Sequence, residues 1–324
     1  MIKIVLDMMG GDNGSAPTIE AVKEFIKEHD DVEIVAVGEE NDMKLLEGTP
    51  RVSFVYSKSV VPMECSVMQA MRAKDSSVYL AVNKVNELKA DGIVSAGSTG
   101  AFLSLVTLIN KKLEGVDRPA LITPFPTKVP GKYVVLLDVG ASTENSSDDL
   151  VQFATMGQAY AKVVFNNPEP NVYLISNGTE EGKGSPLYKE TYQKLKEKNP
   201  SFKGYVEGRN VYDGERDVVV FDGFTGNIFL KTAEGMAKMM SGMIKEAFMS
   251  SGSAKIGYLF AKKGFARIKK TMDYKKVGGA LLVGVNTIAV KAHGNSDAGA
   301  YKASIEIVYQ LAKNKVIEKI KENL

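Results

Sequence analysis

Residues 217–234 constrain the fold more than any other part of this chain. Four apolar residues, from Val218 to Phe221, form an unbroken run typical of a strand buried on both faces of a parallel sheet. A turn of small and polar residues follows, and then an amphipathic segment with Lys231 in its first turn. Because the first N–H groups of a helix have no partner within it, such a helix start suits an anion. The alternative is a tight turn whose glycines only satisfy backbone geometry.

The same order of strand, small-residue turn and helix recurs along the chain. Apolar strands at residues 2–6, 133–137 and 172–176 end in DMMGGDNG, DVGA and NGTEEGKG, and a strand that ends at Ser95 leads through AGSTGA into an apolar helix. This alternation predicts an α/β fold, a doubly wound α/β/α sandwich with a mostly parallel sheet. We expect residues 1–324 to form a single α/β domain with a protruding helical region at about 236–275.

Polar and glycine residues in these turns are the candidates for binding a substrate, because ligands of parallel sheets bind at the carboxyl ends of strands. The alternative for a residue such as Ser98 is a helix N-cap, which needs no further function. The candidates are Asp7, Gly10, Gly11, Asp12, Ser95, Gly97, Ser98, Thr99, Asn177, Gly178, Thr179, Asp222, Thr225 and Gly226.

Lys183 lies in the glycine-rich turn after the strand at 172–176, where a lysine suits a phosphate oxygen. The turn resembles an ATP-binding P-loop only superficially. The spacing from Gly178 to Gly182 is one residue short, and Gly184 stands where Ser or Thr would bind magnesium. We therefore exclude ATP binding, and the alternative for Lys183 is a surface lysine in a turn.

Composition excludes several classes of function. The chain has 41 basic and 39 acidic side chains, so no general field attracts nucleic acid. One cysteine, Cys65, excludes an intramolecular disulfide framework and is expected to be a small buried hydrophobe. Two histidines leave little scope for a histidine-based metal centre, so we expect no metal and no cofactor. His29 lies in a charged run predicted to be exposed loop, whereas His293 follows an apolar run.

No signal peptide or apolar run of transmembrane length is evident, which predicts a cytoplasmic protein with peripheral membrane contact at most. Residues 236–249 are rich in methionine, and packing in the core or in a dimer is the default explanation. Residues 254–272 carry a helical stripe for packing against another helix: Tyr258, Ala261, Phe265, Ile268 and Met272. Off this stripe, Ile256, Leu259 and Phe260 form an apolar tip. Basic side chains fill much of the remaining surface: Lys262, Lys263, Arg267, Lys269 and Lys270.

Eight short motifs together resemble a known family. In chain order they are DMMGGD, VSAGSTGA, DRPAL, LDVGA, NGTEEGKG, DGFTGNIFLK, MDYKKVGGA and KAHGNSDA. They span almost the whole chain and resemble the bacterial phosphate acyltransferases of phospholipid synthesis. The resemblance implies transfer of a long fatty acyl group from acyl carrier protein to inorganic phosphate. The acyl phosphate product would serve a membrane acyltransferase that acylates glycerol 3-phosphate.

The resemblance also implies a homodimer with an isocitrate-dehydrogenase/phosphotransacetylase-like fold and peripheral contact with the inner face of the membrane. For this reaction, we expect Lys183 and Lys231 to offset the charge of phosphate, which must lie beside a thioester carbonyl. Asn227 is the candidate for stabilising the oxyanion, and His293 for relaying a proton. The apolar tip would contact the membrane; the alternative is that its helix docks the acidic carrier protein.

Other functions remain open at this point. A phosphotransacetylase-like enzyme acting on short acyl-CoA would share the fold and the phosphate site. An isocitrate-type dehydrogenase needs a carboxylate cluster for a metal and a nicotinamide site, and neither is clear in the sequence. A non-catalytic, membrane-associated scaffold of lipid synthesis is disfavoured by the intact glycine-rich turns. The chain departs from the family pattern at Asn13, at residues 64–66 and at Ser142.

Overall fold

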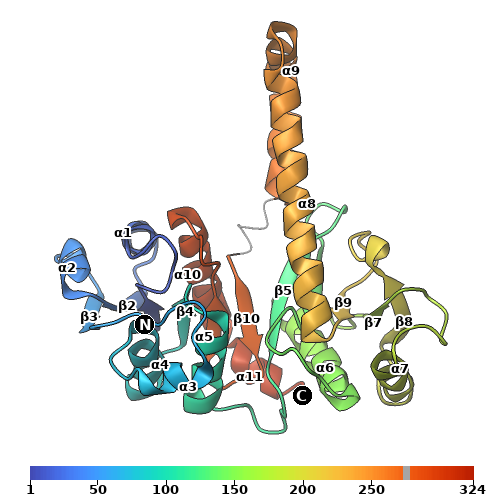
Figure 1. Cartoon of the computed structure of the whole chain (residues 1–324), viewed down its shortest axis with the longest axis horizontal. Coiled ribbons are helices and arrows are strands. Elements are labelled where there is room, and N and C mark those ends of the chain that lie inside the picture. Colours follow the sequence, from blue (N-terminus) through green and yellow to red (C-terminus); the bar gives the residue numbers. More distant parts are fainter. Residues whose placement is uncertain (273–277) are drawn as a thin grey trace.

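The computed structural model describes residues 1–272 and 278–324, and the side chains of residues 1–264 and 278–324. It shows a broad body from which one long helical hairpin rises (Figure 1). Several side chains of the predicted helical stripe and of the basic surface therefore lie outside the described residues, and so does part of the MDYKKVGGA motif. These positions are Phe265, Arg267, Ile268, Lys269, Lys270 and Met272.

The strands follow the apolar runs of the sequence. They are β1 (Ile2–Asp7), β2 (Val32–Gly38), β3 (Val52–Tyr56), β4 (Gly92–Ser95), β5 (Ala120–Pro126), β6 (Tyr133–Leu137), β7 (Val172–Ser176), β8 (Phe202–Glu207), β9 (Val218–Val220), β10 (Ala280–Val283) and β11 (Ile288–Lys291). The three valines of β9 are fully buried, as expected for a strand covered on both faces.

The helices alternate with the strands. The α-helices are α1 (Ala16–Glu28), α2 (Glu40–Met43), α3 (Val67–Arg72), α4 (Ser77–Glu87), α5 (Thr99–Leu105), α6 (Ser147–Val164), α7 (Pro186–Lys198), α8 (Gly223–Met249), α9 (Gly252–Met272), α10 (Ala298–Lys313) and α11 (Val316–Lys321). Two short 3₁₀ helices, η1 (Lys44–Leu46) and η3 (Gly208–Asn210), and one π-helix, η2 (Val106–Asn110), complete the described elements.

All the described strands belong to one sheet, in the order β3-β2-β1-β4-β11-β10-β5-β6-β9-β7-β8. Pairing is parallel from β3 to β11 and from β6 to β8. Between these two blocks, β10 runs antiparallel to β11 and β5, and β5 runs antiparallel to β6. The mostly parallel sheet of the prediction is confirmed. The three reversals mean, however, that the two parallel blocks run in opposite directions.

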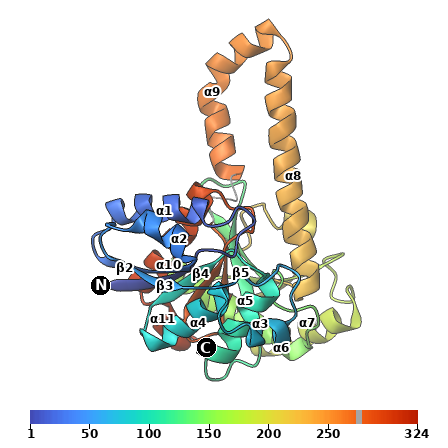
Figure 2. The ribbon, with the colours of Figure 1, turned by 60° about the vertical axis from the view of Figure 1, so that its left-hand side comes forward.

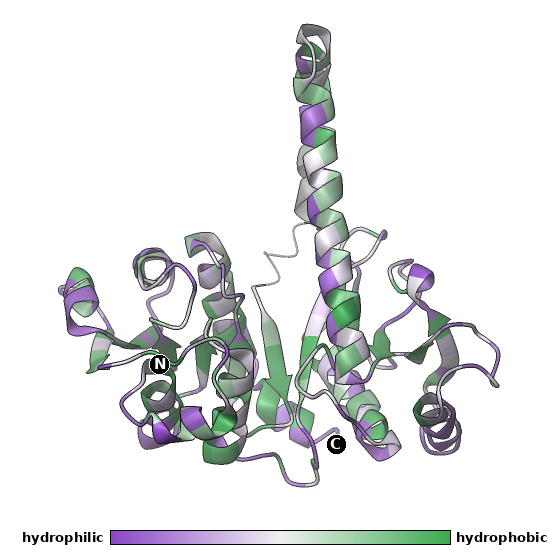
Figure 3. Cartoon of the chain, in the orientation of Figure 1, coloured by the Kyte–Doolittle hydropathy of each residue, from purple (hydrophilic) through white to green (hydrophobic). Residues whose placement is uncertain are grey.

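Helices cover both faces of the sheet, which confirms the predicted sandwich. Alternate residues of a strand face opposite sides. Along β5, Ile122 faces the cavity lined by α6 and α10, whereas Leu121 and Thr123 face the groove lined by α5 and α8. Figure 3 shows apolar residues concentrated in the central strands and hydrophilic residues on outer helices such as α7.

The turn after β6 is organised by the buried carboxylate of Asp138. It accepts hydrogen bonds from the backbone N–H groups of Leu121 (3.0 Å), Gly140 (3.0 Å), Ala141 (2.8 Å) and Ser142 (3.1 Å). Burial raises the pKa of this carboxyl group, and the hydrogen bonds offset part of the rise. Ser142, a departure from the family pattern, also donates its hydroxyl to Asp138 at 3.1 Å.

Helix α8 begins in close contact with this turn. Its N-cap is Asp222, whose side chain accepts the backbone N–H of Thr225 at 2.9 Å. A Cβ atom added at Gly226 would lie 1.9 Å from the carbonyl oxygen of Asp138. Only glycine therefore lets the first turn of α8 approach the end of β6 so closely.

The hairpin of α8 and α9 stands clear of the body in both views (Figures 1 and 2). Helix α8 has 27 residues, about 40 Å of helix. The two helices touch near the tip, where the rings of Phe248 and Tyr258 lie 5.5 Å apart. In the predicted apolar tip, Leu259 is 68% exposed and Phe260 is 88% exposed, and Ile256 is also exposed.

The methionine-rich segment is not part of the core, so one of its two default explanations is wrong. The side chains of Met236, Met239, Met240, Met243 and Met249 are all exposed, because α8 leaves the body at this height and packs against α9. None of the helices in the described ranges is long and apolar enough to cross a membrane.

Three local predictions also need correction. Lys231 lies in the third turn of α8, because the helix already begins at Gly223. His29 is not exposed loop: its ring lies 4.4 Å from that of Phe25 and 4.3 Å from that of Tyr309, and its Nε2 lies 2.9 Å from Glu306. His29 is the C-cap residue of α1, and its ring packs against α10. Cys65 is only half-buried, on the outside of the core.

We predict that Gly226→Ala lowers the free energy of unfolding by about 3 kcal/mol, the upper end of overpacking costs. The added methyl group would displace α8 from Asp138. Gly235→Ala is the matched control on the same helix, because nothing lies within 4 Å of its added Cβ. It should instead stabilise by about 1 kcal/mol through helix propensity. Denaturant melts of both variants measure this, and equal stabilities would contradict the close approach.

Candidate active site

A groove of about 440 Å³ lies along β5 and β10, between α5 and α8. The start of α5, the turn after β6, one side of α8 and the turn after β11 contribute its walls. The polar side chains that line it are Thr99, Thr123, Ser142, Thr143, Asn227, Lys231, Glu234, Lys291 and His293.

Helix α8 joins the two ends of the groove. Asn227 packs against Gly140 in the turn after β6, where an added Cβ would lie 3.1 Å from the Asn227 amide carbon. Seven residues later, Glu234 lies 3.5 Å from Nε2 of His293 in the turn after β11. Seven helical residues span about 10 Å. One straight helix thus brings together turns that follow strands of opposite direction.

Two lysines, Lys231 and Lys291, give the groove its cationic character. Lys291 ends β11, and its Nζ donates a hydrogen bond to the carbonyl of Ala292. Burial lowers the pKa of Lys291 to about 8, although the nearby carboxylates of Asp7 and Asp12 act in the opposite direction. An anion bound in the groove would help to keep this lysine protonated.

Glu234 lies beside these cations. Burial raises its pKa, and Lys231, three residues earlier on the same side of α8, offsets part of the rise. A carboxyl group facing His293 can orient the imidazole ring, so the pair has the arrangement of a positioned proton carrier.

Predicted residues at the ends of β1 and β4 build the floor beneath the groove. Asp7 is buried and accepts a hydrogen bond of 2.6 Å from Ser95, whose oxygen in turn accepts the N–H of Gly97. Burial raises the pKa of Asp7, and the bond from Ser95 offsets part of the rise. A Cβ at Gly10 would lie 2.6 Å from the nitrogen of Gly97, so these loops need glycine for contact.

The neighbouring predicted residues lie closer to the groove. Asp12 donates its N–H to the carbonyl of Gly294 at 2.8 Å, and Gly11 packs on the same carbonyl. Ser98 is the N-cap of α5, as in the structural alternative for this residue. Thr99 follows it and lines the groove directly.

The predicted residues after β7 lie elsewhere. Lys183 is exposed and its side chain lies against Gly178, while Asn177 accepts the N–H of Gly184 at 3.2 Å within the same turn. Thr179 is also exposed. None of these residues lines the groove. The reason is topological: β7 belongs to the block that runs opposite to β11, and two strands separate it from β5.

The remaining predicted residues after β9 serve the start of α8. Thr225 and Tyr188 both donate their hydroxyl groups to Oδ2 of Asp222, each at 2.6 Å. Gly226 packs on Asp138 as described above. These groups position α8, and through it Asn227 and Lys231.

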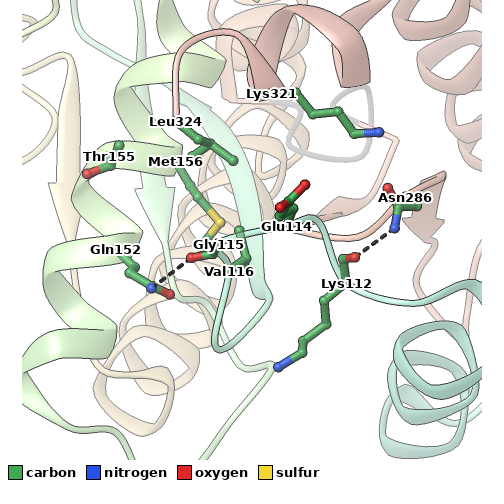
Figure 4. A pocket seen from close by; sticks show the side chains of 10 residues that line it. All are labelled: Lys112, Glu114, Gly115, Val116, Gln152, Thr155, Met156, Asn286, Lys321 and Leu324. Carbon is green, nitrogen blue, oxygen red and sulfur yellow. Dashed lines mark hydrogen bonds between the residues drawn. The ribbon is translucent and has the colours of Figure 1, made fainter.

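A second cavity, of about 750 Å³, lies at the opposite end of β11 from Lys291, where β5 and β11 begin (Figure 4). Two of its polar side chains already pair with backbone groups of the cavity: Gln152 donates to the carbonyl of Gly115, and Asn286 to that of Lys112. No predicted site residue lines it. The groove is therefore the candidate active site.

Lys291 and Glu234 were missed as site residues by the sequence analysis. Both had a signal: Lys291 closes an apolar strand just before His293, and Glu234 follows Lys231 at helical spacing. Within the described residues, no group of three His, Cys, Asp or Glu side chains is placed to hold a metal ion.

Comparison with known proteins decides the family. Residues 2–319 match a family model described as "Fatty acid synthesis protein". The chain is 39% identical over 325 residues to a phosphate acyltransferase from Mycoplasma mobile, covering 99% of each chain. It is 40% identical over 323 residues to a phosphate acyltransferase from Exiguobacterium sibiricum, covering 98% of this chain and 97% of the relative. The chain belongs to the phosphate acyltransferase family. It is an acyltransferase, as its motifs indicated.

Solved structures of other phosphate acyltransferring enzymes share the fold. A phosphotransacetylase from Streptococcus pyogenes has a TM-score of 0.64 at 18% identity, covering 98% of this phosphate acyltransferase and 94% of that chain. A branched-chain phosphotransacylase from Enterococcus faecalis has a TM-score of 0.61 at 13% identity, covering 96% and 99%. At these identities the likeness establishes the fold alone, and it confirms the predicted phosphotransacetylase-like architecture.

We predict that inorganic phosphate binds this acyltransferase less tightly as the pH rises through about 8, because Lys291 then loses its charge. Lys291→Arg keeps the charge at every pH tested, so its affinity should lack the decline that the wild-type protein shows above pH 8. Calorimetric titration with phosphate measures both profiles. The same decline in the arginine variant would show that another group is responsible.

Proposed function

We propose that this phosphate acyltransferase moves a long-chain fatty acyl group from acyl carrier protein to inorganic phosphate, giving acyl phosphate for phospholipid synthesis. One observation carries the proposal: Lys231, Lys291, His293 and Asn227 meet in a single groove. Two lysines can hold a doubly charged phosphate, and a histidine with an amide beside them can serve acyl transfer. No cofactor is required, because the thioester is already activated.

The groove supports a direct displacement. An oxygen of phosphate attacks the thioester carbonyl, a C–O bond forms, and the C–S bond breaks as the carrier thiol leaves. Lys231 and Lys291 hold the phosphate near the carbonyl, so that orientation lowers the barrier. Asn227 stabilises the oxyanion of the tetrahedral intermediate. His293, oriented by Glu234, gives a proton to the departing thiolate.

A phosphotransacetylase-like activity on short acyl-CoA is the competing function, because it would use the same groove. Purified protein incubated with phosphate and either palmitoyl-carrier protein or acetyl-CoA separates the two. The proposal requires phosphate-dependent release of the carrier thiol. Turnover of acetyl-CoA alone would overturn it.

We predict that Lys231→Ala lowers this phosphate-dependent turnover more than tenfold and raises KM for phosphate, because the groove loses a cation. Lys183→Ala is the matched comparison. That lysine is exposed and does not line the groove, so its loss should change turnover less than threefold. A tenfold loss at Lys183 would instead assign phosphate binding to the turn after β7, as its sequence alone indicates. Thermal melts of both variants control for folding.

A homodimer is part of the proposal. Exposed apolar side chains continue along α8 from Phe224 and Ile228 to the methionines of 236–249. A continuous exposed apolar surface of this kind is typical of a protein interface, and twofold pairing buries it on both copies. Sedimentation of the protein as a monomer at micromolar concentration would contradict this assignment.

We also propose that the enzyme works in the cytoplasm, in peripheral contact with the inner face of the membrane. Its contact site is the tip formed by Ile256, Leu259 and Phe260, which is covered by nothing in the described chain. Burying a leucine or phenylalanine in lipid contributes about 1.5–3 kcal/mol. Lys262 and Lys263 follow the tip and each add about 1 kcal/mol near anionic lipid. Such contact would place the enzyme beside the membrane acyltransferase that consumes acyl phosphate.

We predict that Leu259→Glu with Phe260→Glu abolishes flotation of the protein with anionic vesicles and leaves turnover of palmitoyl-carrier protein in solution unchanged. Leu45→Glu is the control, because Leu45 is also an exposed apolar residue but lies in η1 on the body. If flotation persists and the affinity for carrier protein falls instead, the tip is a docking site for the carrier.

A further inference from the structure

The pairing of β5 with β10 stops before either strand ends. The last hydrogen-bonded pair is Ile122 with Leu281. Two residues further in the same register, Pro124 stands opposite Gly279. Beyond this point β5 stays paired with β6 as far as Pro126, and β10 stays paired with β11 as far as Ala280 opposite Lys291. The sheet therefore splits between β5 and β10, which lie side by side at its centre (Figure 1).

The residues at the split explain why the pairing of β5 with β10 stops there. Pro124 has no backbone N–H to offer a neighbouring strand. Gly279 is drawn toward β11: an added Cβ would lie 2.5 Å from the carbonyl oxygen of Lys291. Neither residue has a long side chain that would block the gap.

A cavity of about 730 Å³ opens on the other face of the sheet at this split. Its walls are the end of α6 with Tyr160, Val164 and Phe165, the middle of α10 with Ala303 and Ile307, and Leu281 of β10. Most of these side chains are apolar. Pro124 and Gly279 line both this cavity and the groove of the active site, so the two spaces meet at the split.

We propose that the split in the sheet is a passage and that the apolar cavity between α6 and α10 holds the tail of the fatty acyl chain while its thioester lies in the groove. This inference rests on the proposed function. Lys291 pairs directly with Ala280, next to Gly279, so a carbonyl near Lys291 lies close to the passage. An unbranched alkyl chain is narrow enough to pass between two residues without bulky side chains. Each methylene buried beyond the passage should raise affinity about fourfold.

The cavity can be filled from either helix. Val164→Trp on α6 and Ile307→Trp on α10 place an indole ring in the space for the tail. Thr155→Trp is the matched control, because Thr155 is also half-buried on α6 but lines the separate cavity at the start of β5. Melts of the three variants confirm that they fold.

The first measurement compares kcat/KM for 16-carbon and 8-carbon acyl-carrier protein. We expect each filling variant to lower the ratio of long to short substrate at least tenfold, mainly through KM, while Thr155→Trp leaves it within twofold of wild type. A ratio unchanged by Val164→Trp and Ile307→Trp, or changed equally by the control, would overturn the proposal.

The second measurement does not depend on the acyl donor. A fluorescent 16-carbon fatty acid should bind the wild-type protein and the Thr155 variant, and at least tenfold more weakly the two filled variants. If wild-type protein binds it in this way but turns over no acyl-carrier protein, the proposed function fails and the tail site stands. If filling the cavity leaves fatty acid binding unchanged, the tail site fails whatever the turnover shows.

Discussion

The reversal of strand direction at the centre of the sheet is the constraint on which this molecule depends. A fully parallel sheet would gather every glycine-rich turn at one end of the strands. Here β10 and β5 run against their neighbours, so the turns after β1, β4 and β11 lie at one end and the turns after β6, β7 and β9 lie at the other. Residues from these two sets of turns can therefore meet in one site only where another element spans the face of the sheet.

Helix α8 makes that connection, and the buried groups at its start determine where it lies. Asp138 holds the turn after β6 in shape, and Gly226 allows the helix to lie directly on it. From that base, Asn227, Lys231 and Glu234 rise along one side of α8 and reach His293 and Lys291. Residues that do not line the groove, such as Asp222 and Gly226, therefore matter to its geometry because they set the position of this helix.

Much of the fold could be predicted from the sequence, because buried strands and small-residue turns have local signatures. The apolar runs that begin at Val218 and Tyr133 form β9 and β6, and a helix follows the turn after each of these strands. Asn227, Lys231 and His293 could be proposed as site residues because each follows a buried strand closely in sequence, and all three line the groove. The order and direction of strands depend instead on pairing between distant segments, which has no local signature. For that reason Lys183 looked equivalent to Lys231, although the two lysines lie after different strands of the sheet.

The environments of single side chains could not be predicted from local sequence patterns either. The pKa of Lys291 is lowered by its burial under distant segments of the chain, and Asp7, nearly three hundred residues away in sequence, offsets part of that shift. His29 looked like a loop residue because its partner, Glu306, lies 277 positions further along the chain. The family resemblance supplied the reaction, but the structure was needed to locate the groove and the groups that surround it.

The length of α8 also sets a height for the active site. From Glu234 to the last residue of the helix at Met249 there are fifteen residues, about 22 Å of rigid rod. When the tip contacts a surface, the reacting carbonyl in the groove lies at about that distance from the surface. Acyl phosphate made in the groove is therefore not delivered where it forms. With the α8 methionines buried in the proposed dimer, it has to travel that distance along the faces of the hairpin that the pairing leaves uncovered.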